Sequence, residues 1–252
     1  MSHPDTHDSA LNQFTWPSTL DSNLDRKDLL LCVFAEQRFV AAQVRACKLD
    51  QKDYLLSLID SASTVNDGTG PPSGFEANRM RNVIAEAATK GHWGKPSGHG
   101  RAQGIAAHYD SQTCVAVVLD VEVSDEGRVS VHDVVVVADL GLVENPGRLR
   151  SQLKGACLMG VAFVTSGDNG PTTANPSPVD DNCTNWPLLS LLPRQIAVYL
   201  INPTQTLEAR QPSQLIYVPV VRALCNAICS AAGARAIHLP FRSQLLERTV
   251  YR

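Results

Sequence analysis

Apolar residues in the first third of the chain recur at intervals of three and four, which is the spacing of one helix face. This pattern predicts a helix over residues 28–47 and a shorter helix that begins just after Asp50, whose side chain is suited to cap it. A third helix is predicted over residues 77–90 and is expected to stop at Gly91. Residues 61–74 are rich in Ser, Gly and Pro, which is typical of a surface loop. The front of the chain is therefore predicted to be helical.

The period of the apolar positions then changes to two, which is typical of β-strands. Strands are predicted over residues 104–108 and 113–123, and a third strand over residues 128–138 returns after a turn at 124–127. The odd-numbered residues from 115 to 123 are all apolar and are expected to form one buried face. The middle of the chain is therefore predicted to form a long β-hairpin.

The last third of the chain mixes helical and strand patterns. Asn145-Pro146 is expected to break the third strand, and a helix is predicted over residues 148–164. Residues 195–201 are predicted to form a buried strand, and residues 219–232 an amphipathic helix. Small residues in the first of these helices are expected where another element approaches closely: Gly155, Ala156 and Gly160.

Taken in order, these elements predict an α+β fold, in which a helical N-terminal section is followed by a mixed β-sheet packed by helices. Residues 1–24 are polar and are expected to form a flexible arm. Residues 25–95 are assigned to the helical section, and residues 96–252 to the α+β domain. The chain is therefore expected to have one main folded unit behind a helical front.

The charge of the chain gives no reason to expect a polyanionic partner. The formal net charge is -3, the pI is about 6.1 and the basic residues are scattered, so nucleic-acid binding is not predicted. No stretch reaches the roughly eighteen consecutive apolar residues that a membrane span needs. The first residues lack a basic region followed by an apolar run, so no secretory signal is expected.

The seven cysteines are an odd number and include no Cys-x-x-Cys pair, which predicts reduced thiols in a cytoplasmic protein. Cys225 and Cys229 have the spacing of two metal ligands on a helix, but no further ligand accompanies them, so they are interpreted as buried thiols. No four-cysteine arrangement for an iron–sulfur cluster is found. The weaker metal candidates share no predicted face or are loop carboxylates: His92, His99, His108, Asp180 and Asp181.

Several short sequence blocks carry the clearest signal for function, because they share their order and spacing with the blocks of a known protein family. They are Lys48-Leu49-Asp50, Trp93-Gly94-Lys95-Pro96, residues 104–108, Asp139-Leu140-Gly141, Asn145-Pro146, Gln152-x-x-Gly155, residues 182–189 and residues 223–227. With these blocks the chain resembles the C-terminal half of the molybdenum-cofactor subunit of the xanthine dehydrogenase and aldehyde oxidase family. It is similar in particular to the isoquinoline 1-oxidoreductase β-subunit branch of that family.

The resemblance implies that the chain is part of an oxidoreductase. Family members use a molybdenum–pterin cofactor to hydroxylate aldehydes or N-heterocycles with oxygen taken from water. Their cofactor lies between two halves of the large subunit, and only the second half has a counterpart in this sequence. The resemblance therefore implies a homo- or hetero-oligomer, with a second molybdopterin-binding chain and an iron–sulfur subunit as partners. The cofactor is expected only if such a chain completes the site.

The position of the family's catalytic base is changed in this sequence. Alignment on Pro219 and residues 223–227 places Ser213 at the Gly, and Gln214 at the Glu, of the family's Gly-Glu pair. A glutamine has nearly the shape of a glutamate but cannot act as a titrating proton acceptor. Losing a general base typically slows a reaction by about 10²- to 10⁴-fold. Glu208 is a substitute base only if the loop is rearranged.

Gln152 is the second candidate site residue, because it corresponds to a family glutamine that contacts the pterin. With Ser213, it is a candidate cofactor-binding residue; its other interpretation is a helix residue on a packing surface. Lys154 stands where the family has a Glu, which reverses a charge near the expected cofactor. This lysine could pair with a phosphate, or it is a solvated helix residue.

Three functions remain open from the sequence. The first is a subunit of a molybdenum-dependent hydroxylase that another chain completes. The second is a catalytically inactive pseudoenzyme that acts as a binding or scaffold module, which the replacement of the base by Gln214 favours. The third is a small-molecule binding protein that uses the space left by the missing half. In all three, the chain alone is expected to be inactive.

Overall fold

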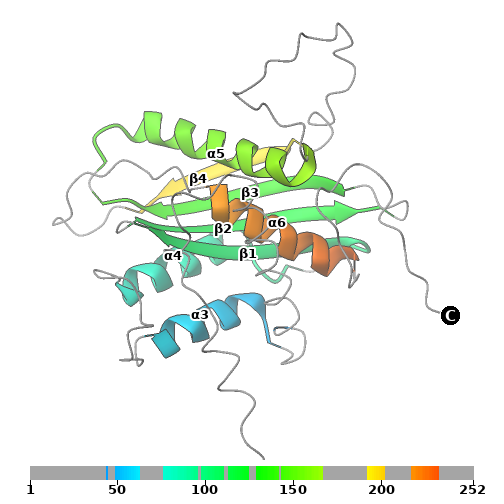
Figure 1. The fold of residues 1–252 in the computed structure, drawn as a ribbon, viewed down its shortest axis with the longest axis horizontal. Helices are drawn as coiled ribbons and strands as arrows, with labels where there is room; N and C mark the ends of the chain where they lie inside the picture. The colour runs from blue at the N-terminus through cyan, green and yellow to red at the C-terminus, as the bar shows by residue number, and fades with distance from the viewer. Residues whose placement is uncertain are drawn as a thin grey trace, which may run out of the picture.

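The computed structural model describes residues 44, 49–62, 76–95, 98–110, 113–124, 129–141, 143–166, 192–201 and 217–232. Along this part of the chain two helices are followed by a run of three strands, and then by a helix, a strand and a helix, as Figure 1 shows. They are α3 (Gln51–Ala62), α4 (Ala77–Lys90), β1 (Arg101–Asp110), β2 (Thr113–Val123), β3 (Val129–Asp139), α5 (Pro146–Ser166), β4 (Gln195–Leu200) and α6 (Tyr217–Ala232).

The strands form one mixed sheet in the order β1-β2-β3-β4. β1, β2 and β3 pair antiparallel with their neighbours, whereas β4 pairs parallel with β3. A parallel neighbour needs a crossover connection, and α5 lies in that connection. The predicted α+β class and the mixed sheet are therefore confirmed. A β-bulge follows Asp120 in β2, where His132 is the extra residue of β3.

The sheet is covered on both faces. α3 and α4 lie on one face, and α5 and α6 lie on the other (Figure 1). The predicted face of β2 is confirmed, since Val115, Val117, Leu119 and Val121 pack against α5 and α6. The even-numbered residues from 114 to 118 are buried as well, against α4. Burial of both faces explains why β2 and β3 read as nearly continuous apolar runs.

α4 has the predicted bounds, and it buries one apolar face on the sheet. Its buried residues are Met80, Val83, Ile84 and Ala87. Gly91 follows the helix, as predicted, but its φ of -83° is available to any residue. The reason for glycine is space, because a Cβ at Gly91 would lie 2.7 Å from Cγ1 of Val118. The division of the chain at residue 95 stays a prediction, and α4 shares its core with the sheet that follows.

The start of α5 corrects the predicted role of Asn145-Pro146. β3 ends at Asp139, well before this pair, so Asn145-Pro146 does not break the strand. Instead, the Asn145 side chain accepts a hydrogen bond of 2.9 Å from the backbone N–H of Arg148, and Pro146 is the first helical residue. A side-chain cap followed by proline is a common helix start.

Of the two glycines at which close approaches were predicted in α5, only Gly160 has one. A Cβ at Gly160 would lie 2.9 Å from Cβ of Val220, so α6 packs directly on it. The prediction for Gly155 is wrong, because a Cβ there would meet nothing within 4 Å. Ala156 is partly buried against the same core as Gly160.

The remaining predictions fall partly outside the described residues. The arm at 1–24 lies entirely outside them, and of the helix predicted at 28–47 only Val44 is described, in a helical conformation. α3 continues to Ala62, so the first two residues of the loop predicted at 61–74 are helical. Within the part of the chain that the structure describes, no helix has the length and apolar character to cross a bilayer. The cytoplasmic location stays a prediction.

Candidate functional site

Gln152 lies on the outward face of α5, where its side chain is exposed. Arg148, Gly155 and Met159 follow the same stripe at helical spacing, and Met159 is 42% exposed. The opposite side of α5, with Leu149, Leu153 and Cys157, is buried in the core shared with α6. Gln152 is therefore held on a rigid helix and presented away from the described core.

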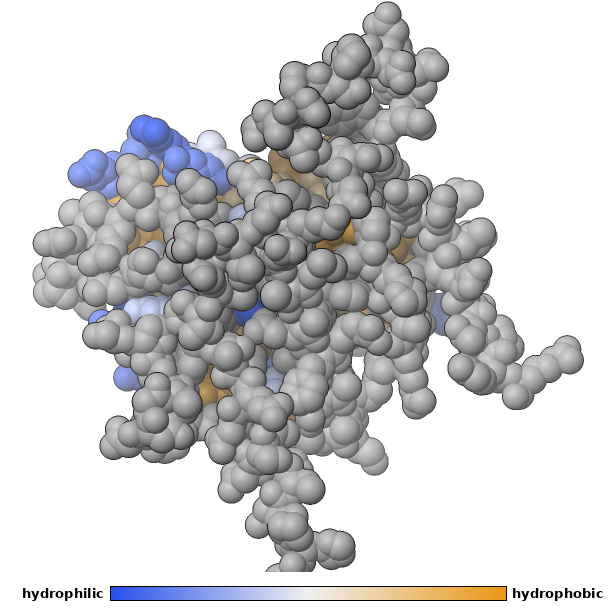
Figure 2. Space-filling view, in the orientation of Figure 1, coloured by the Kyte–Doolittle hydropathy of each residue, from blue (hydrophilic) through white to orange (hydrophobic). Residues whose placement is uncertain are grey.

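The first turns of α5 carry positive charge. Arg148, Arg150 and Lys154 are all exposed, and the first turn holds no acidic residue. Figure 2 shows strongly hydrophilic side chains at the corner of the molecule where Figure 1 places the start of this helix. The backbone N–H groups at a helix N-terminus add a partial positive charge. This end of α5 therefore suits an anionic group better than a neutral one.

The predicted catalytic position directly precedes α6, but Ser213, Gln214 and Glu208 lie outside the described residues. α6 itself begins beside α5, because a Cβ at Gly160 would lie 3.2 Å from the carbonyl oxygen of Tyr217. Gln152 stands eight residues before Gly160 on the same helix, a distance of about 12 Å along its axis. The start of α6, which the predicted catalytic position precedes in the sequence, therefore lies beside the helix that carries Gln152.

Asp139 of the Asp-x-Gly block binds Arg79 of α4. Nε and Nη2 of Arg79 each donate a hydrogen bond of 2.9 Å to the Asp139 carboxylate. This bond raises the pKa of Arg79 above its ordinary value, against the opposing effect of burial. Gly141 follows with a φ of 76°, which is the left-handed region that favours glycine. The block therefore fixes the turn that leads from the sheet toward α5.

Asp50 joins two other blocks of the resemblance. Its carboxylate accepts a hydrogen bond of 2.8 Å from the backbone N–H of Lys52, which caps α3 as predicted. It also accepts hydrogen bonds of 3.0 and 3.1 Å from Nε1 of Trp93. The start of α3 is therefore tied to the turn that follows α4.

Ile105 in β1 receives two side-chain partners from distant helices. Its backbone N–H donates to Oε1 of Gln51 at 3.4 Å, and Nδ2 of Asn226 donates to its carbonyl oxygen at 3.1 Å. Next to it, a Cβ at Gly104 would collide with the carbonyl of Ala223 and lie 2.5 Å from the backbone nitrogen of Ala227. Residues 104–108 and 223–227 thus contact each other, with α6 lying directly on the strand.

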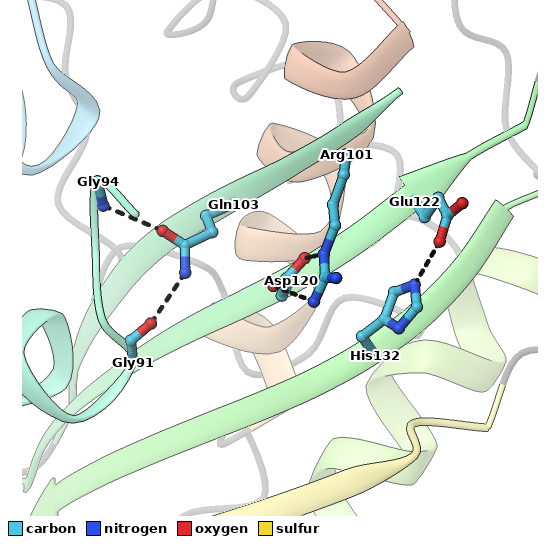
Figure 3. A network of polar contacts seen from close by, with 7 residues as sticks. All are labelled: Gly91, Gly94, Arg101, Gln103, Asp120, Glu122 and His132. Atoms are coloured by element: carbon cyan, nitrogen blue, oxygen red, sulfur yellow. Dashed lines mark hydrogen bonds and ion pairs between the residues drawn. The ribbon is translucent and has the colours of Figure 1, made fainter. Parts of the chain in front are cut away.

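A row of polar contacts lies on the α4 face of the sheet, beyond the end of that helix (Figure 3). Arg101 donates two hydrogen bonds of 2.8 Å to Asp120, which raises the pKa of Arg101. His132, at the bulge, lies 2.8 Å from a carboxylate oxygen of Glu122. The side chain of Gln103 holds the turn after α4, with bonds to Gly91 O at 2.8 Å and from Gly94 N at 3.0 Å. None of these contacts was indicated by the sequence patterns.

The described residues hold no cluster of three or more His, Cys, Asp or Glu that could bind a metal ion. Cys225 is buried and its pKa is raised by that burial, whereas Cys229 is only half-buried. The interpretation as thiols on a packed helix agrees with this for Cys225. His92, His99 and His108 come from separate segments and join no such cluster, while Asp180 and Asp181 lie outside the described residues.

Neither of two hollows in the described part of the chain includes a residue of α5. An enclosed cavity of about 30 Å³ between α3, β1 and α6 has room for a water molecule and not for a cofactor. An open hollow of about 430 Å³ is lined by His92, Trp93, Gly94 and Lys95. Neither hollow therefore places a cofactor-sized space against Gln152.

Comparison with known proteins decides the family. A family model described as a molybdopterin cofactor-binding domain matches residues 43–168, which is half of the chain. The chain belongs to the molybdopterin cofactor-binding domain family. The match runs from the blocks around Asp50 to the end of α5, and it includes Gln152. The resemblance to the xanthine dehydrogenase and aldehyde oxidase family is therefore confirmed for this domain.

The chain is also similar to one curated protein, the membrane-bound aldehyde dehydrogenase [pyrroloquinoline-quinone] of Gluconacetobacter polyoxogenes. The two are 28% identical over 205 residues, which are 77% of this chain and 26% of that protein. Among solved structures, quinoline 2-oxidoreductase from Pseudomonas putida 86 matches with 15% identity and a TM-score of 0.33. That match covers 74% of this chain and 22% of the other. The chain thus spans about a quarter of the length of these proteins.

The residues of α5 fit one side of a pterin cofactor. An exposed glutamine amide both donates and accepts hydrogen bonds, as the edge of a pterin ring requires. The cationic first turns of the helix suit the phosphate that such a cofactor carries. Neither of the two hollows described above includes a residue of this face.

Proposed function

We propose that this chain forms one wall of the cofactor site of a molybdenum-dependent hydroxylase, and that another polypeptide supplies the rest. The observation that carries this proposal is the exposure of Gln152 on the outward face of α5. A glutamine on a packing surface of the domain would be covered by its own core. Here the amide points to a surface where a cofactor and a second chain can both reach it.

The exposed face of α5 supports the same proposal. The exposed stripe that contains Gln152 also contains Met159, an apolar side chain that a partner would cover. A homo- or hetero-oligomer, with an iron–sulfur subunit among its chains, is part of this proposal.

In this assembly the chain would bind and orient the cofactor, and Gln214 would not act as the general base. The bound molybdenum–pterin group would supply the oxidation chemistry. Gln214 can donate or accept hydrogen bonds at the position of the family's glutamate, but it cannot take up a proton in turnover. A base would have to come from Glu208 or from the partner.

A second candidate function is an inactive homologue that acts as a binding or scaffold module. Two sequence features favour it: the base position is Gln214, and Lys154 replaces a family carboxylate. In this case the domain fold would be retained while the cofactor site is lost. The third function, small-molecule binding in the vacated space, gains no support from the two hollows described above, since neither includes a residue of α5.

The deciding experiment is metal and pterin analysis of the protein purified from its own host, with every co-purifying chain identified. Near-stoichiometric molybdenum and pterin, together with a second polypeptide, are expected. Gln152→Ala should lower the retained pterin, whereas the matched control Ser151→Ala, one residue away and equally exposed, should not. Absence of metal and pterin from every natively purified preparation would overturn the hydroxylase proposal.

The same preparations should be analysed for pyrroloquinoline quinone, because the name of the curated relative assigns that cofactor to it. A quinone in place of molybdenum would contradict the proposed cofactor while leaving a redox role for the domain. Gln214→Glu then separates the two candidate functions. Appreciable turnover after this change would exclude the inactive homologue, whereas no turnover in the loaded assembly would favour it.

A further inference from the structure

The outer edge of β4 has backbone groups that no described residue binds. Ile201, just after the strand, donates its backbone N–H to the carbonyl of Ala138 at 2.9 Å. Because backbone groups alternate in direction along a strand, the odd-numbered residues of β4 face β3. The backbone N–H and C=O groups of Ile196, Val198 and Leu200 therefore point away from the sheet.

The opposite edge of the sheet has side-chain partners at Ile105. Ile105 in β1 points its backbone groups outward, and Gln51 and Asn226 bind both of them. α6 also lies directly over this edge strand at Gly104. At β4, the described residues offer no side chain that plays the same part. The two edges of the sheet therefore differ in whether side chains bind their outward backbone groups.

β4 also lacks the features by which edge strands usually avoid pairing. Its sequence, QIAVYL, contains no charged residue, proline or glycine. The prediction that the strand over residues 195–201 is buried is wrong, because no residue of β4 is fully buried, whereas β2 is buried along most of its length. Leu192 before the strand is 39% exposed, and Tyr199 within it is 40% exposed. An apolar strand left this open is suited to pair with another strand.

We propose that β4 pairs antiparallel with β4 of a second copy of this chain, about a two-fold axis at Val198. The two four-stranded sheets would then form one continuous sheet across the dimer. In a two-fold contact every residue meets its own symmetry mate, so a charge on the axis would repel itself. β4 has no charge, and its outward residues Ile196 and Leu200 are placed symmetrically about Val198. All three outward residues can therefore exchange backbone hydrogen bonds.

The side chains of β4 are complementary in the same arrangement. With the axis at Val198, Ala197 of one copy lies opposite Tyr199 of the other, so a small side chain meets a large one. Tyr199 is already held on its own chain by the ammonium group of Lys90, 5.3 Å from the ring centroid. This pairing uses a different element from the α5 face, and it holds whether or not a cofactor is bound.

Sedimentation equilibrium of the full chain tests the proposal, with Val198→Pro as the variant. Proline removes an outward N–H and no bond to β3, so the strand itself should be retained. The dimer constant should weaken by about 30-fold or more, because both hydrogen bonds at the axis are lost. The matched control is Ala107→Pro, which removes an outward N–H from β1 and should leave the dimer intact. A wild-type monomer at all concentrations, or a dimer unchanged by Val198→Pro, would overturn the proposal.

Amide hydrogen exchange on the wild-type chain gives a second test that needs no variant. The amides of Ile196, Val198 and Leu200 should exchange slowly at high protein concentration and rapidly on dilution. Those of Ala197 and Tyr199, which face β3, should be slow in both conditions. Rapid exchange of the outward amides in a sample shown to be dimeric would place the dimer contact elsewhere. Protection that appears only with a different protein would replace the second copy with that partner.

Discussion

The guanidinium of Arg79 and the carboxylate of Asp139 are joined by two hydrogen bonds of 2.9 Å, at the junction between α4 and the end of β3. Their side chains are only 11% and 5% exposed. Asp139 is buried at the end of β3, directly after the apolar run 134–138, so its charge needs a partner within the protein. This pair links the helix on one face of the sheet to the turn that leads to α5 on the other.

Arg79→Leu should destabilise the protein by about 3–5 kcal/mol, because it leaves a buried carboxylate without its partner. The matched control is Arg81→Leu on the same helix. Arg81 also pairs with a carboxylate, that of Asp60, but the two side chains are 37% and 64% exposed. An exposed pair of this kind contributes about 0–1 kcal/mol. Urea denaturation of both variants measures the difference, and equal losses would contradict the assigned role of Arg79.

Two glycine-to-alanine changes should have opposite signs. Gly104→Ala places a methyl group against the backbone of Ala223 and Ala227, which cannot move aside without shifting α6. We expect a loss of at least about 1–3 kcal/mol. Gly155→Ala adds a methyl group in open space on a helix, where alanine is favoured by about 0.5–1 kcal/mol. Thermal or urea unfolding measures both changes; a neutral Gly104→Ala would show that α6 does not lie on β1.

Alkaline pH should destabilise the fold through its buried thiols. Burial raises the pKa of Cys114 and of Cys157 from 9.0 to about 12. Both groups stay protonated in the folded state while they ionise in the unfolded state. Their contribution is therefore complete below about pH 9 and is lost as the pH rises toward 12, at about 1.4 kcal/mol per pH unit per thiol.

The measurement is the free energy of unfolding between pH 8 and pH 10.5, in the wild type and in Cys157→Ala. The variant should be less stable at pH 8, since it loses packing, but its stability should fall less steeply with pH. The same burial predicts that Cys157 is not alkylated in the native state at pH 8. An identical pH dependence in the two proteins would show that this thiol is accessible or absent from the core.

Asp50→Ala removes a helix cap and a tryptophan partner at once. We expect a loss of about 1–2 kcal/mol, which is the range for a capping side chain. The fluorescence of Trp93 should also change, because its indole N–H loses the carboxylate that it binds. Asp53→Ala, in the first turn of the same helix, is the control, since Asp53 makes only an exposed ion pair with Lys52. An unchanged Trp93 signal in Asp50→Ala would contradict the link between α3 and this turn.

Local patterns in the sequence predicted the elements well where the period was unbroken. α4 and β2 have the predicted bounds, because each carries an uninterrupted apolar period. The same patterns could not tell which face of the sheet each helix covers. Nor could they separate Gly155 from Gly160, since only the packing of α6 distinguishes an open position from a crowded one.

The role of Gln152 as a cofactor-binding residue stays a prediction. Gln152 was found through its sequence block, but its exposure depends on which side of α5 meets the core. Arg79 was missed, because an arginine early in a helix resembles any solvated residue. One signal could have indicated it: an aspartate at the end of a long apolar strand implies a buried cation nearby. Gln51 and Asn226 gave no such signal, since amides are common on helix surfaces.

The parallel pairing of β3 with β4 has a consequence for how the chain folds. β1, β2 and β3 are close in the sequence, so they can pair early in folding. The pairing of Val134 in β3 with Ile196 in β4 joins residues far apart in the sequence, so it forms later. Until α5 has packed and β4 has arrived, the run of four valines from Val134 to Val137 remains an open sheet edge. Newly made chains are therefore most prone to aggregate at this step, and the last strand to join covers the edge of this valine run.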